Sequence, residues 1–434
     1  MSNNDFQRHA TRRGLLTSAL GLGISIQFLG SRAWADSEGG LAKRRLVVII
    51  CRGGLDGLSL SPPVGDSSYV PLRGAIAIAG FGQPGGALQL DETFGLHPSL
   101  AAVHALALKG EARIAPAIAT PDRERSHFEA QDVLESGGTV AYGTGSGWLN
   151  RALEAMGPAG SVRALSLGPT APLVLRGKIE AVSWSPGGVQ GHDSRLPGIL
   201  QDLYAHDPLL GPALAGGLAT QSMAGVATSQ AAAAMGDPAP AMNAMAPGAP
   251  PPRRQGVAVA RQLGATLAGF MTQSGGAQVA AVEMDAFDTH ANQGAAEGQL
   301  ASRLASVDAF LNGLQSGLSQ PANGAGDAWR DTVVVMATEF GRTARVNGTG
   351  GTDHGTASTA LVLGGALKRG GLIGDWPTLA ANRLFENRDT APTLDMRGLF
   401  KGVLRDHLGV ERTKLDTLVF PGSGAVAPVG GLVA

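Results

Sequence analysis

The sequence predicts an α/β protein, a three-layer α/β/α sandwich built on a mostly parallel sheet. Short apolar runs rich in β-branched residues recur along the chain and are separated by longer segments with helical spacing. These runs are continuous rather than alternating, which is typical of strands buried on both faces. The 434 residues include only 16% charged residues but 64 Gly, as expected of a loop-rich globular chain with a large core.

Residues 1–35 have the layout of an export signal. Three Arg precede an apolar stretch, and the small-residue sequence AWA follows it at residues 33–35. The run TRRGLL at residues 11–16 resembles a twin-arginine signal, which predicts a periplasmic or secreted protein. The alternative is a membrane anchor. Because the apolar stretch is short and a cleavage site follows it, we expect no stable membrane anchor after cleavage.

The charge balance argues against nucleic acid and anionic membranes as partners. Residues 1–35 hold four Arg and one Asp, so the rest of the chain has 30 basic and 34 acidic residues and no basic patch. Cys51 is the only cysteine, which excludes an intramolecular disulfide. It closes an apolar run and is expected to be a small buried residue.

Residues 36–434 are expected to form the α/β/α domain, with its elements in the following order. Strands are expected at residues 46–51, 113–119, 163–167, 277–284, 332–337 and 360–363. Helices are expected at residues 98–109, 147–156, 196–205, 256–272, 297–318 and 396–408. Pro116 suits the edge or end of its strand. Residues 211–254, rich in Ala, Met and Pro, are expected to be an insertion within the domain.

Polar clusters follow four of the expected strands, where ligands bind in open parallel sheets. Asp56 follows the first strand in RGGLDG, which is neither a Walker loop nor a GxGxxG fingerprint, and is either a turn residue or a ligand. Ser126 and His127 follow the second strand at an apparent helix start. Ser126 has capping-box spacing to Glu129, yet the positive helix end and the neighbouring imidazole also suit a nucleophile, so both interpretations stay open.

The two remaining clusters offer metal ligands. Asp288 and His290 supply an oxygen and a nitrogen after the strand at residues 277–284, a set that suits zinc or manganese. The segment TEFGRTARVNGTGGTDHG at residues 338–355 contains two further groups of ligand type. Glu339 stands at the strand end, and Asp353 and His354 follow in the loop.

Two arginines of the same segment, Arg342 and Arg345, could clamp an anion. The alternative is a surface loop with scattered charges. Five glycines allow close backbone approach, which favours a loop that wraps a metal and its ligand.

Six segments together resemble the domain-of-unknown-function 1501 (DUF1501) family of exported proteins. They are VVIICRGGLDGLS, FGLHPSL, RSHFEAQD, FDTHANQ, EFGRT with NGTGGTDHG, and LDMRGLF. That family is grouped with the alkaline phosphatase-like superfamily. The resemblance implies an α/β/α sandwich with two metal ions beside a Ser or Thr nucleophile.

The resemblance also implies roles for individual residues. Asp56 matches the acidic ligand after the first strand, and Ser126 matches the nucleophile. Asp288 with His290 matches the ligands of one metal, and Asp353 with His354 resembles the pair of the other. The spacing departs from the superfamily in three ways. Glu339 occupies the place directly after the strand, the first pair is more closely spaced, and no final histidine ligand follows, since His407 falls in an expected helix.

We therefore expect an exported metal-dependent hydrolase of phosphate or sulfate esters, acting on a small anionic ester. Ser126 would be the nucleophile, beside His127, and Arg342 would offset the charge of the anion. Zinc is the first choice of metal, with manganese, magnesium or calcium as alternatives. The expected metal ligands are Asp56, Asp288, His290, Glu339, Asp353 and His354. The alternative function is a non-catalytic exported binding or assembly protein with a co-exported protein partner.

Overall fold

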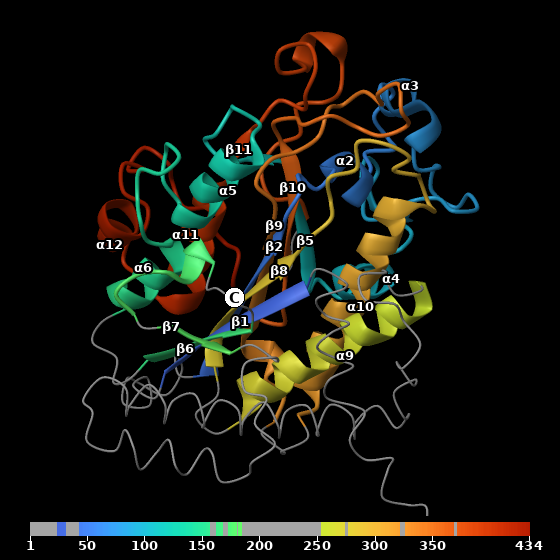
Figure 1. Cartoon of the computed structure of the whole chain (residues 1–434). Coiled ribbons are helices and arrows are strands. Elements are labelled where there is room, and N and C mark those ends of the chain that lie inside the picture. The colour runs from blue at the N-terminus through green and yellow to red at the C-terminus, as the bar shows by residue number, and fades with distance from the viewer. Residues whose placement is uncertain are drawn as a thin grey trace, which may run out of the picture.

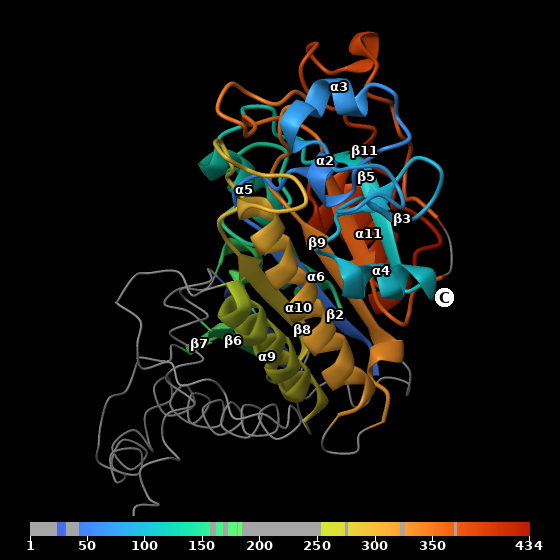
Figure 2. The ribbon, with the colours of Figure 1, turned by 90° about the vertical axis from the view of Figure 1, so that its right-hand side faces the viewer.

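A central sheet lies between two layers of helices in the computed structural model of the chain (Figure 1). The structure describes residues 24–31, 43–156, 162–167, 172–179, 181–184, 253–273, 277–321, 326–368 and 371–434. One helical layer contains α4 (Ala101–Leu108), α9 (Arg253–Thr272) and α10 (Gln299–Ser319). The other contains α5 (His127–Ser136), α6 (Trp148–Ala155) and α11 (Met396–Leu408). The view in Figure 2 shows α9 and α10 lying across one face of the sheet.

The sheet has nine strands in the order β11-β5-β10-β9-β2-β8-β1-β6-β7. Their bounds are β1 Ile24–Ser31, β2 Arg45–Cys51, β5 Ala112–Ala119, β6 Val162–Leu167, β7 Ala181–Trp184, β8 Ala277–Met284, β9 Thr332–Ala337, β10 Ser358–Leu363 and β11 Leu394–Asp395. β10 and β1 pair antiparallel with both neighbours, and the other pairings are parallel. All strands except β1 and β10 therefore point the same way, and the sheet is mostly parallel as predicted.

Smaller elements surround this framework. The helices α2 (Gly57–Leu60), α3 (Tyr69–Arg73) and α12 (Arg412–Lys414) are short. The strands β3 (Leu88–Gln89) and β4 (Gly95–Leu96) form a separate antiparallel pair. Single helical turns occupy Gly74–Ile76, Leu173–Leu175, Trp329–Asp331, Ala381–Arg383 and Leu415–Val419.

β2 contributes its side chains to two separate cores, which explains why its apolar run is continuous. Val47, Ile49 and Cys51 belong to the core that also holds the apolar residues of α9 and α10. The alternate residues Leu46, Val48 and Ile50 belong to the core on the α6 and α11 side. Successive side chains of a strand point to opposite faces, so a strand covered on both faces needs no polar alternation. Cys51 is buried, as expected.

The antiparallel position of β10 was not predicted, and it decides where the segment at residues 338–357 lies. β10 pairs with β9, with Leu361 opposite Met336. The chain therefore leaves β9 at the carboxyl edge of the sheet and re-enters the sheet from the same edge. Glu339 and His354, near the two ends of this connection, therefore lie on the same edge and both contact His127, although 15 positions separate them in the sequence.

Most expected elements are confirmed, with bounds that differ by a few residues. The strands at 277–284 and 332–337 and the helix at 396–408 coincide with β8, β9 and α11. Pro116 lies where β5 skips a residue against β10, since Ser358 pairs with Ile118 and Ala360 with Ala115. This bulge removes the need for a backbone donor at Pro116.

The segment with the layout of an export signal contributes a strand to the sheet. β1 lies between β8 and β6 and falls within residues 1–35. The expected helix at residues 196–205 and residues 211–252 of the expected insertion lie outside the described residues. None of the described helices combines the length and apolar character that a membrane span needs.

Candidate metal centre

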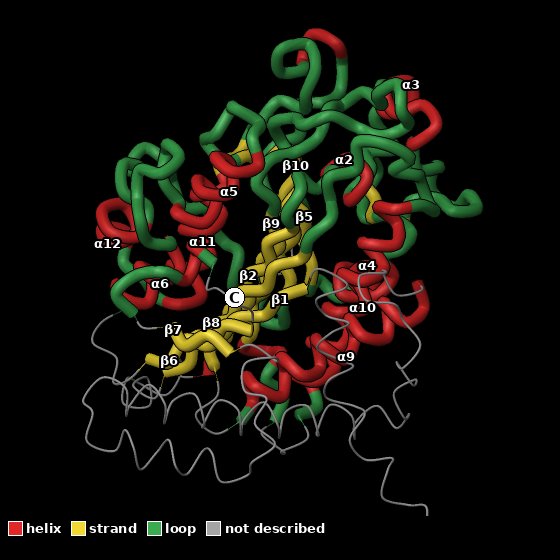
Figure 3. The backbone as a smooth tube through the Cα atoms, in the orientation of Figure 1, coloured by secondary structure: helices red, strands yellow, loops and turns green. Residues whose placement is uncertain are grey.

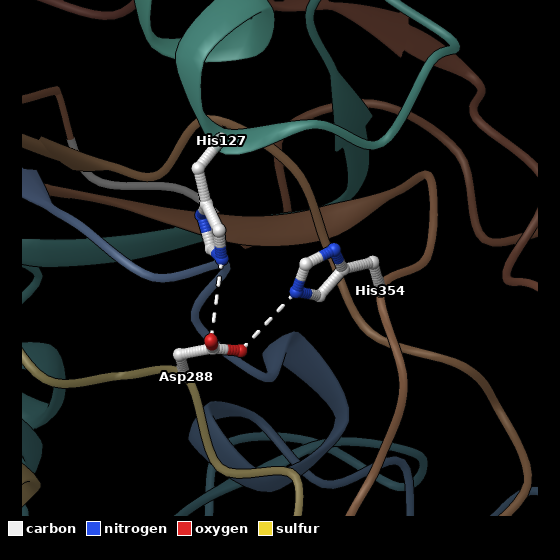
Figure 4. Close-up of side chains that lie close together, drawn as sticks. All are labelled: His127, Asp288 and His354. Carbon is white, nitrogen blue, oxygen red and sulfur yellow. Dashed lines mark hydrogen bonds and ion pairs between the residues drawn. The ribbon is translucent and has the colours of Figure 1, made fainter.

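Three loops at the carboxyl edge of the sheet bring the candidate ligands together, in the region of loops above the strands in Figure 3. His127 is the first residue of α5 and follows the β5 loop. Asp288 and His290 lie in the loop after β8, and His354 lies in the connection between β9 and β10. Figure 4 shows His127 and His354 directed at the carboxylate of Asp288. The ligand atoms of these three residues lie within 4.8 Å of one another.

The histidine nitrogens in this cluster are all Nε2 atoms, and they surround one carboxylate. His127 Nε2 lies 3.3 Å from Asp288 Oδ2. His290 Nε2 and His354 Nε2 lie 3.0 and 3.2 Å from Asp288 Oδ1. The two latter nitrogens are 3.0 Å apart. Three nitrogens and a carboxylate thus point at a common space.

The opposite nitrogen of each ring faces a hydrogen-bond acceptor. His354 Nδ1 lies 2.8 Å from the backbone carbonyl oxygen of Arg125, and His127 Nδ1 lies 2.9 Å from Glu339 Oε1. His290 Nδ1 lies 3.4 Å from Asp353 Oδ1. A carbonyl or carboxylate oxygen only accepts, so each Nδ1 carries the hydrogen, and in the neutral rings each Nε2 carries a lone pair.

Glu339 is the group that fixes His127. Its side chain is fully buried, and its Oε1 accepts from the backbone N–H of Gly53 at 2.7 Å and from Gln131 Nε2 at 3.3 Å. Burial opposes ionisation, but the hydrogen bonds from His127, Gly53 and Thr338 outweigh it and lower the pKa of Glu339. The hydrogen bond to Glu339 in turn raises the pKa of His127. Glu339 therefore lies behind a histidine, as carboxylates do in many metal sites.

Arg342 fixes Asp288 in the same manner. Its side chain is fully buried, and its Nη1 donates to Asp288 Oδ1 at 2.6 Å. The rest of the guanidinium bonds Thr352, with Nε donating to the hydroxyl at 3.1 Å and Nη2 donating to the backbone carbonyl. Burial alone would raise the pKa of Asp288, but the hydrogen bond and charge of Arg342 lower it, so the carboxylate is ionised.

The backbone around the cluster is strained and closely packed. Arg125, Ala286 and Asn292 have φ of 57°, 72° and 48°, a region that residues other than Gly seldom adopt, and each lies two positions from a histidine or aspartate of the cluster. Gly351 packs against the backbone of His290, because a Cβ at Gly351 would lie 2.4 Å from the carbonyl carbon of His290. The glycines that the sequence concentrates here thus serve close packing.

Asp56 lies apart from this cluster, although it too is at the carboxyl edge. Its carboxylate is 1% exposed and caps α2. It pairs with the fully buried guanidinium of Arg73 and accepts hydrogen bonds from Ser59 and Gln293. In the part of the chain that the structure describes, no contact joins Asp56 to the three histidines.

The remaining expected site residues lie around the cluster. Ser126 is the N-cap of α5, and its hydroxyl bonds the carboxylate of Glu129. Asp353 holds His290 and accepts from Asn347 Nδ2 at 3.1 Å. Arg345 is exposed on the same connection. Of the expected ligands, the structure brings Asp288, His290 and His354 together, and it places Glu339 and Asp353 one step behind them.

The donor set fits a divalent metal ion. His127 Nε2 is buried, and its contact with Asp288 Oδ2 at 3.3 Å lacks the geometry of a hydrogen bond, which is unusual for a buried polar atom in the described residues. Burial lowers the pKa of His354, so this ring is neutral at neutral pH and offers its lone pair. Imidazole nitrogens with one carboxylate oxygen are ligands that zinc, manganese and iron take in proteins.

Comparison with known proteins adds one finding to this geometry. A family model described as "Protein of unknown function (DUF1501)" matches residues 75–419. The chain belongs to this family. No curated protein and no solved structure matches it. In this DUF1501 protein the matched range contains every member of the histidine cluster, whereas Asp56 and Arg73 precede it.

Sequence reasoning about the DUF1501 chain did not give His127 the position of a ligand, and it missed Gln293, Thr352 and Arg73. The sequence predicts a catalytic role for His127 beside Ser126 and does not predict that it is a ligand. Gln293 closes the segment FDTHANQ, so the segment itself was a signal. Nothing in the spacing connects Arg73 with Asp56, because that contact depends on how α3 packs beside α2.

Proposed function

We propose that this DUF1501 protein is a metal-dependent hydrolase of phosphate or sulfate esters. The observation that carries the proposal is the convergence of three imidazole nitrogens on the ionised Asp288, with the buried Nε2 of His127 lacking a hydrogen-bond partner. His127, Asp288, His290 and His354 would hold the ion. A divalent ion, zinc in the first place, supplies Lewis acidity that polarises an ester and stabilises a deprotonated hydroxyl.

Ser126 is the proposed nucleophile. It precedes His127 and lies at the positive end of the ten-residue helix α5, which favours a developing alkoxide. Its hydroxyl is hydrogen-bonded to Glu129, so this carboxylate is placed to accept the proton that the hydroxyl loses. Arg342 enters the proposal as a positioning residue, because its guanidinium is already bonded to Asp288 and Thr352.

The test is hydrolysis by the purified full chain loaded with zinc or manganese. Suitable substrates are 4-nitrophenyl phosphate, bis(4-nitrophenyl) phosphate and 4-nitrophenyl sulfate. Asp288→Asn and Ser126→Ala are expected to lower kcat at least about a hundredfold. Ser316→Ala, an exposed serine of α10, is the matched control and should leave kcat unchanged. Absence of turnover of all three esters by the metal-loaded protein would refute the proposal.

A non-catalytic binding or assembly role, with a co-exported partner, is the second candidate. It is favoured by the fact that Arg342 and Asp56 are both engaged inside the protein and that the Ser126 hydroxyl bonds Glu129. If Ser126→Ala retains the cellular phenotype of the wild type while Asp288→Asn abolishes it, a binding role explains the metal centre better than hydrolysis does.

Export through the twin-arginine pathway is part of the same proposal, and it rests on the sequence of residues 1–35. Mass spectrometry of the protein recovered from the periplasm should find an N-terminus near residue 36. Cleavage there removes β1, so β8 would lose the partner on one of its sides. An intact N-terminus on the protein from that compartment would contradict export with cleavage.

A further inference from the structure

Asp56 accepts four hydrogen bonds from donors inside the protein. Its Oδ2 accepts from Ser59 Oγ at 2.8 Å, from Gln293 Nε2 at 2.7 Å and from Arg73 Nη2. Its Oδ1 accepts from the backbone N–H of Leu58 at 3.2 Å. Each carboxylate oxygen offers about two lone-pair sites, so the three donors at Oδ2 leave none there for a metal ion. Oδ1 keeps one, but the carboxylate is buried and already paired with the Arg73 guanidinium.

The positive charge beside Asp56 is built into the chain. Arg73 is fully buried, and it also bonds the hydroxyl of Ser59 at 3.0 Å and the backbone carbonyl of Thr343 at 3.3 Å. The guanidinium presents its donors in a rigid planar fork that suits a carboxylate. The guanidinium therefore occupies the position beside Asp56 that a second metal ion would have to take if Asp56 were its ligand.

Hydrogen bonds between buried side chains connect Asp56 with Asp288. Gln293 donates to Asp56 and accepts from the hydroxyl of Thr352 at 3.0 Å. That hydroxyl accepts from Arg342 Nε at 3.1 Å, and Arg342 Nη1 donates to Asp288 at 2.6 Å. Gln293 and Thr352 are each 0% exposed. The chain of bonds ends on both carboxylates with a donor, so the groups that link Asp56 to Asp288 belong to the protein itself.

Asp288 also accepts from a guanidinium, that of Arg342, but its other neighbours are groups of metal-ligand type. The Nε2 atoms of His127, His290 and His354 face its carboxylate, and four of the nitrogen–oxygen and nitrogen–nitrogen separations run from 3.0 to 3.3 Å. Two ligands of one ion lie at most about 4.2 Å apart, twice a bond of about 2.1 Å. The ligand atoms of His127, Asp288 and His354 all lie within 4.8 Å of one another, so closing this trio around one ion takes a shift of under about 1 Å. His290 contacts Asp288 and His354 but lies outside that trio, so it has to move further to join the same ion.

We propose that the centre is mononuclear. One transition-metal ion is held by His127, Asp288, His290 and His354, and Arg73 permanently takes the place of a second cation at Asp56. The inference deepens the proposed function and rests on it for the metal. A set of three nitrogens and one oxygen also selects zinc, manganese or iron over magnesium and calcium, which take oxygen ligands.

The first experiment counts metal in the wild-type full chain. After dialysis against zinc and removal of free ion, elemental analysis should give one zinc per chain, and anomalous diffraction at the zinc edge should give one peak among the three histidines. Two zinc ions per chain, or a peak at Asp56, would overturn the proposal. A millimolar excess of magnesium or calcium should leave the zinc in place, and displacement by either would overturn the selectivity.

The second experiment uses variants that separate the two carboxylates. Asp56→Asn combined with Arg73→Met removes both members of the buried ion pair and so leaves no unpaired charge. This double variant should bind zinc within about threefold of the wild-type affinity, because neither residue touches the ion. His127→Ala and Asp288→Asn should each weaken zinc binding at least about a hundredfold. Mutation of a residue that only orients a ligand typically costs about 10- to 100-fold in metal affinity. Loss of zinc from the double variant while its circular dichroism spectrum stays native would contradict the proposal.

These results also separate the inference from the proposed function. One zinc per chain without ester hydrolysis leaves the mononuclear centre standing and refutes the hydrolase. Two zinc ions with hydrolysis refute the mononuclear centre alone. A chain that binds no zinc, manganese or iron refutes both.

Discussion

The Nε2 atoms of His290 and His354 lie 3.0 Å apart although the Nδ1 atom of each ring faces an acceptor. Two neutral rings held in this way would point lone pair at lone pair, which is repulsive. A cation between or beside the nitrogens removes the repulsion, and either a proton or a metal ion can supply it. The folded protein therefore favours binding of a metal ion at this position, whereas the unfolded chain does not hold the two rings together.

Zinc should accordingly stabilise the protein. An ion that binds only the folded state at a hundred times its dissociation constant adds about 2.7 kcal/mol to the free energy of unfolding. Chemical denaturation with zinc and with a chelator measures the difference. Asp288→Asn should show little difference between the two conditions. Equal denaturation midpoints of the wild type with and without zinc would argue against a metal centre.

Glu339→Gln should weaken metal binding about 10- to 100-fold without removing a ligand. The amide can no longer hold the Nδ1–H of His127 as an ionised acceptor does, and the pKa of His127 should fall because the hydrogen bond to Glu339 is the largest cause that raises it. Zinc titration and NMR titration of the imidazole measure both effects. Glu92→Gln, at an exposed glutamate, is the control. An unchanged pKa of His127 would show that Glu339 does not orient this ring.

Arg342→Gln should destabilise the protein by about 3 kcal/mol, since Arg342 is a buried guanidinium with a carboxylate and a threonine as partners. Zinc affinity should also fall, because Asp288 loses the group that fixes it. Urea denaturation provides the free energy of unfolding. Arg345→Gln changes an exposed arginine three positions later and should have almost no effect. Similar losses in the two variants would mean that the charge of the loop matters, and the contact with Asp288 does not.

Gly351→Ala should cost about 1–3 kcal/mol of stability, as overpacking does elsewhere. The added Cβ would lie 2.4 Å from the backbone of His290 and would push that residue away from the cluster. Gly348→Ala is a close control in the same connection, because a Cβ there meets nothing within 4 Å. Thermal denaturation of both variants, with and without zinc, tests the prediction. If Gly348→Ala lowers the stability more than Gly351→Ala does, the close packing of Gly351 on His290 does not determine which residues this loop tolerates.

His407 should make the free energy of unfolding fall between about pH 6.5 and pH 4. Burial lowers the pKa of His407 from 6.5 to about 4, while Nε2 donates to the backbone carbonyl of Arg45. In this window the unfolded chain binds a proton that the folded protein does not, so stability is present above pH 6.5 and is lost as the pH falls. The full effect is on the order of 3 kcal/mol.

The measurement for His407 is urea denaturation as a function of pH. His407→Gln keeps a donor for the Arg45 carbonyl and should flatten the curve in this window relative to the wild type. His104→Gln, at a half-exposed histidine that also bonds a carbonyl oxygen, is the control. If the free energy of unfolding falls with pH equally in the wild type and in His407→Gln, His407 is not the group that titrates in this window.

The sequence by itself determined the strands and the edge at which chemistry gathers. The runs at residues 46–51 and 332–337 are apolar and β-branched enough to specify buried strands locally, and polar residues after such strands meet at one edge of a parallel sheet. The sequence therefore predicts that Asp288, His290 and His354 gather at this edge. The DUF1501 resemblance pointed to the same residues.

Only the tertiary structure decided which of these groups face one another. Glu339 meets His127 across 212 positions, and Gln293 meets Asp56 across 237. Hydrogen bonds over such separations depend on strand order and on the antiparallel return of β10, which local patterns do not encode. The same packing placed Arg73 beside Asp56, and it placed Arg342 together with the histidines beside Asp288. A buried carboxylate such as Asp56 needs a paired cation, and only the fold decides which residue supplies it.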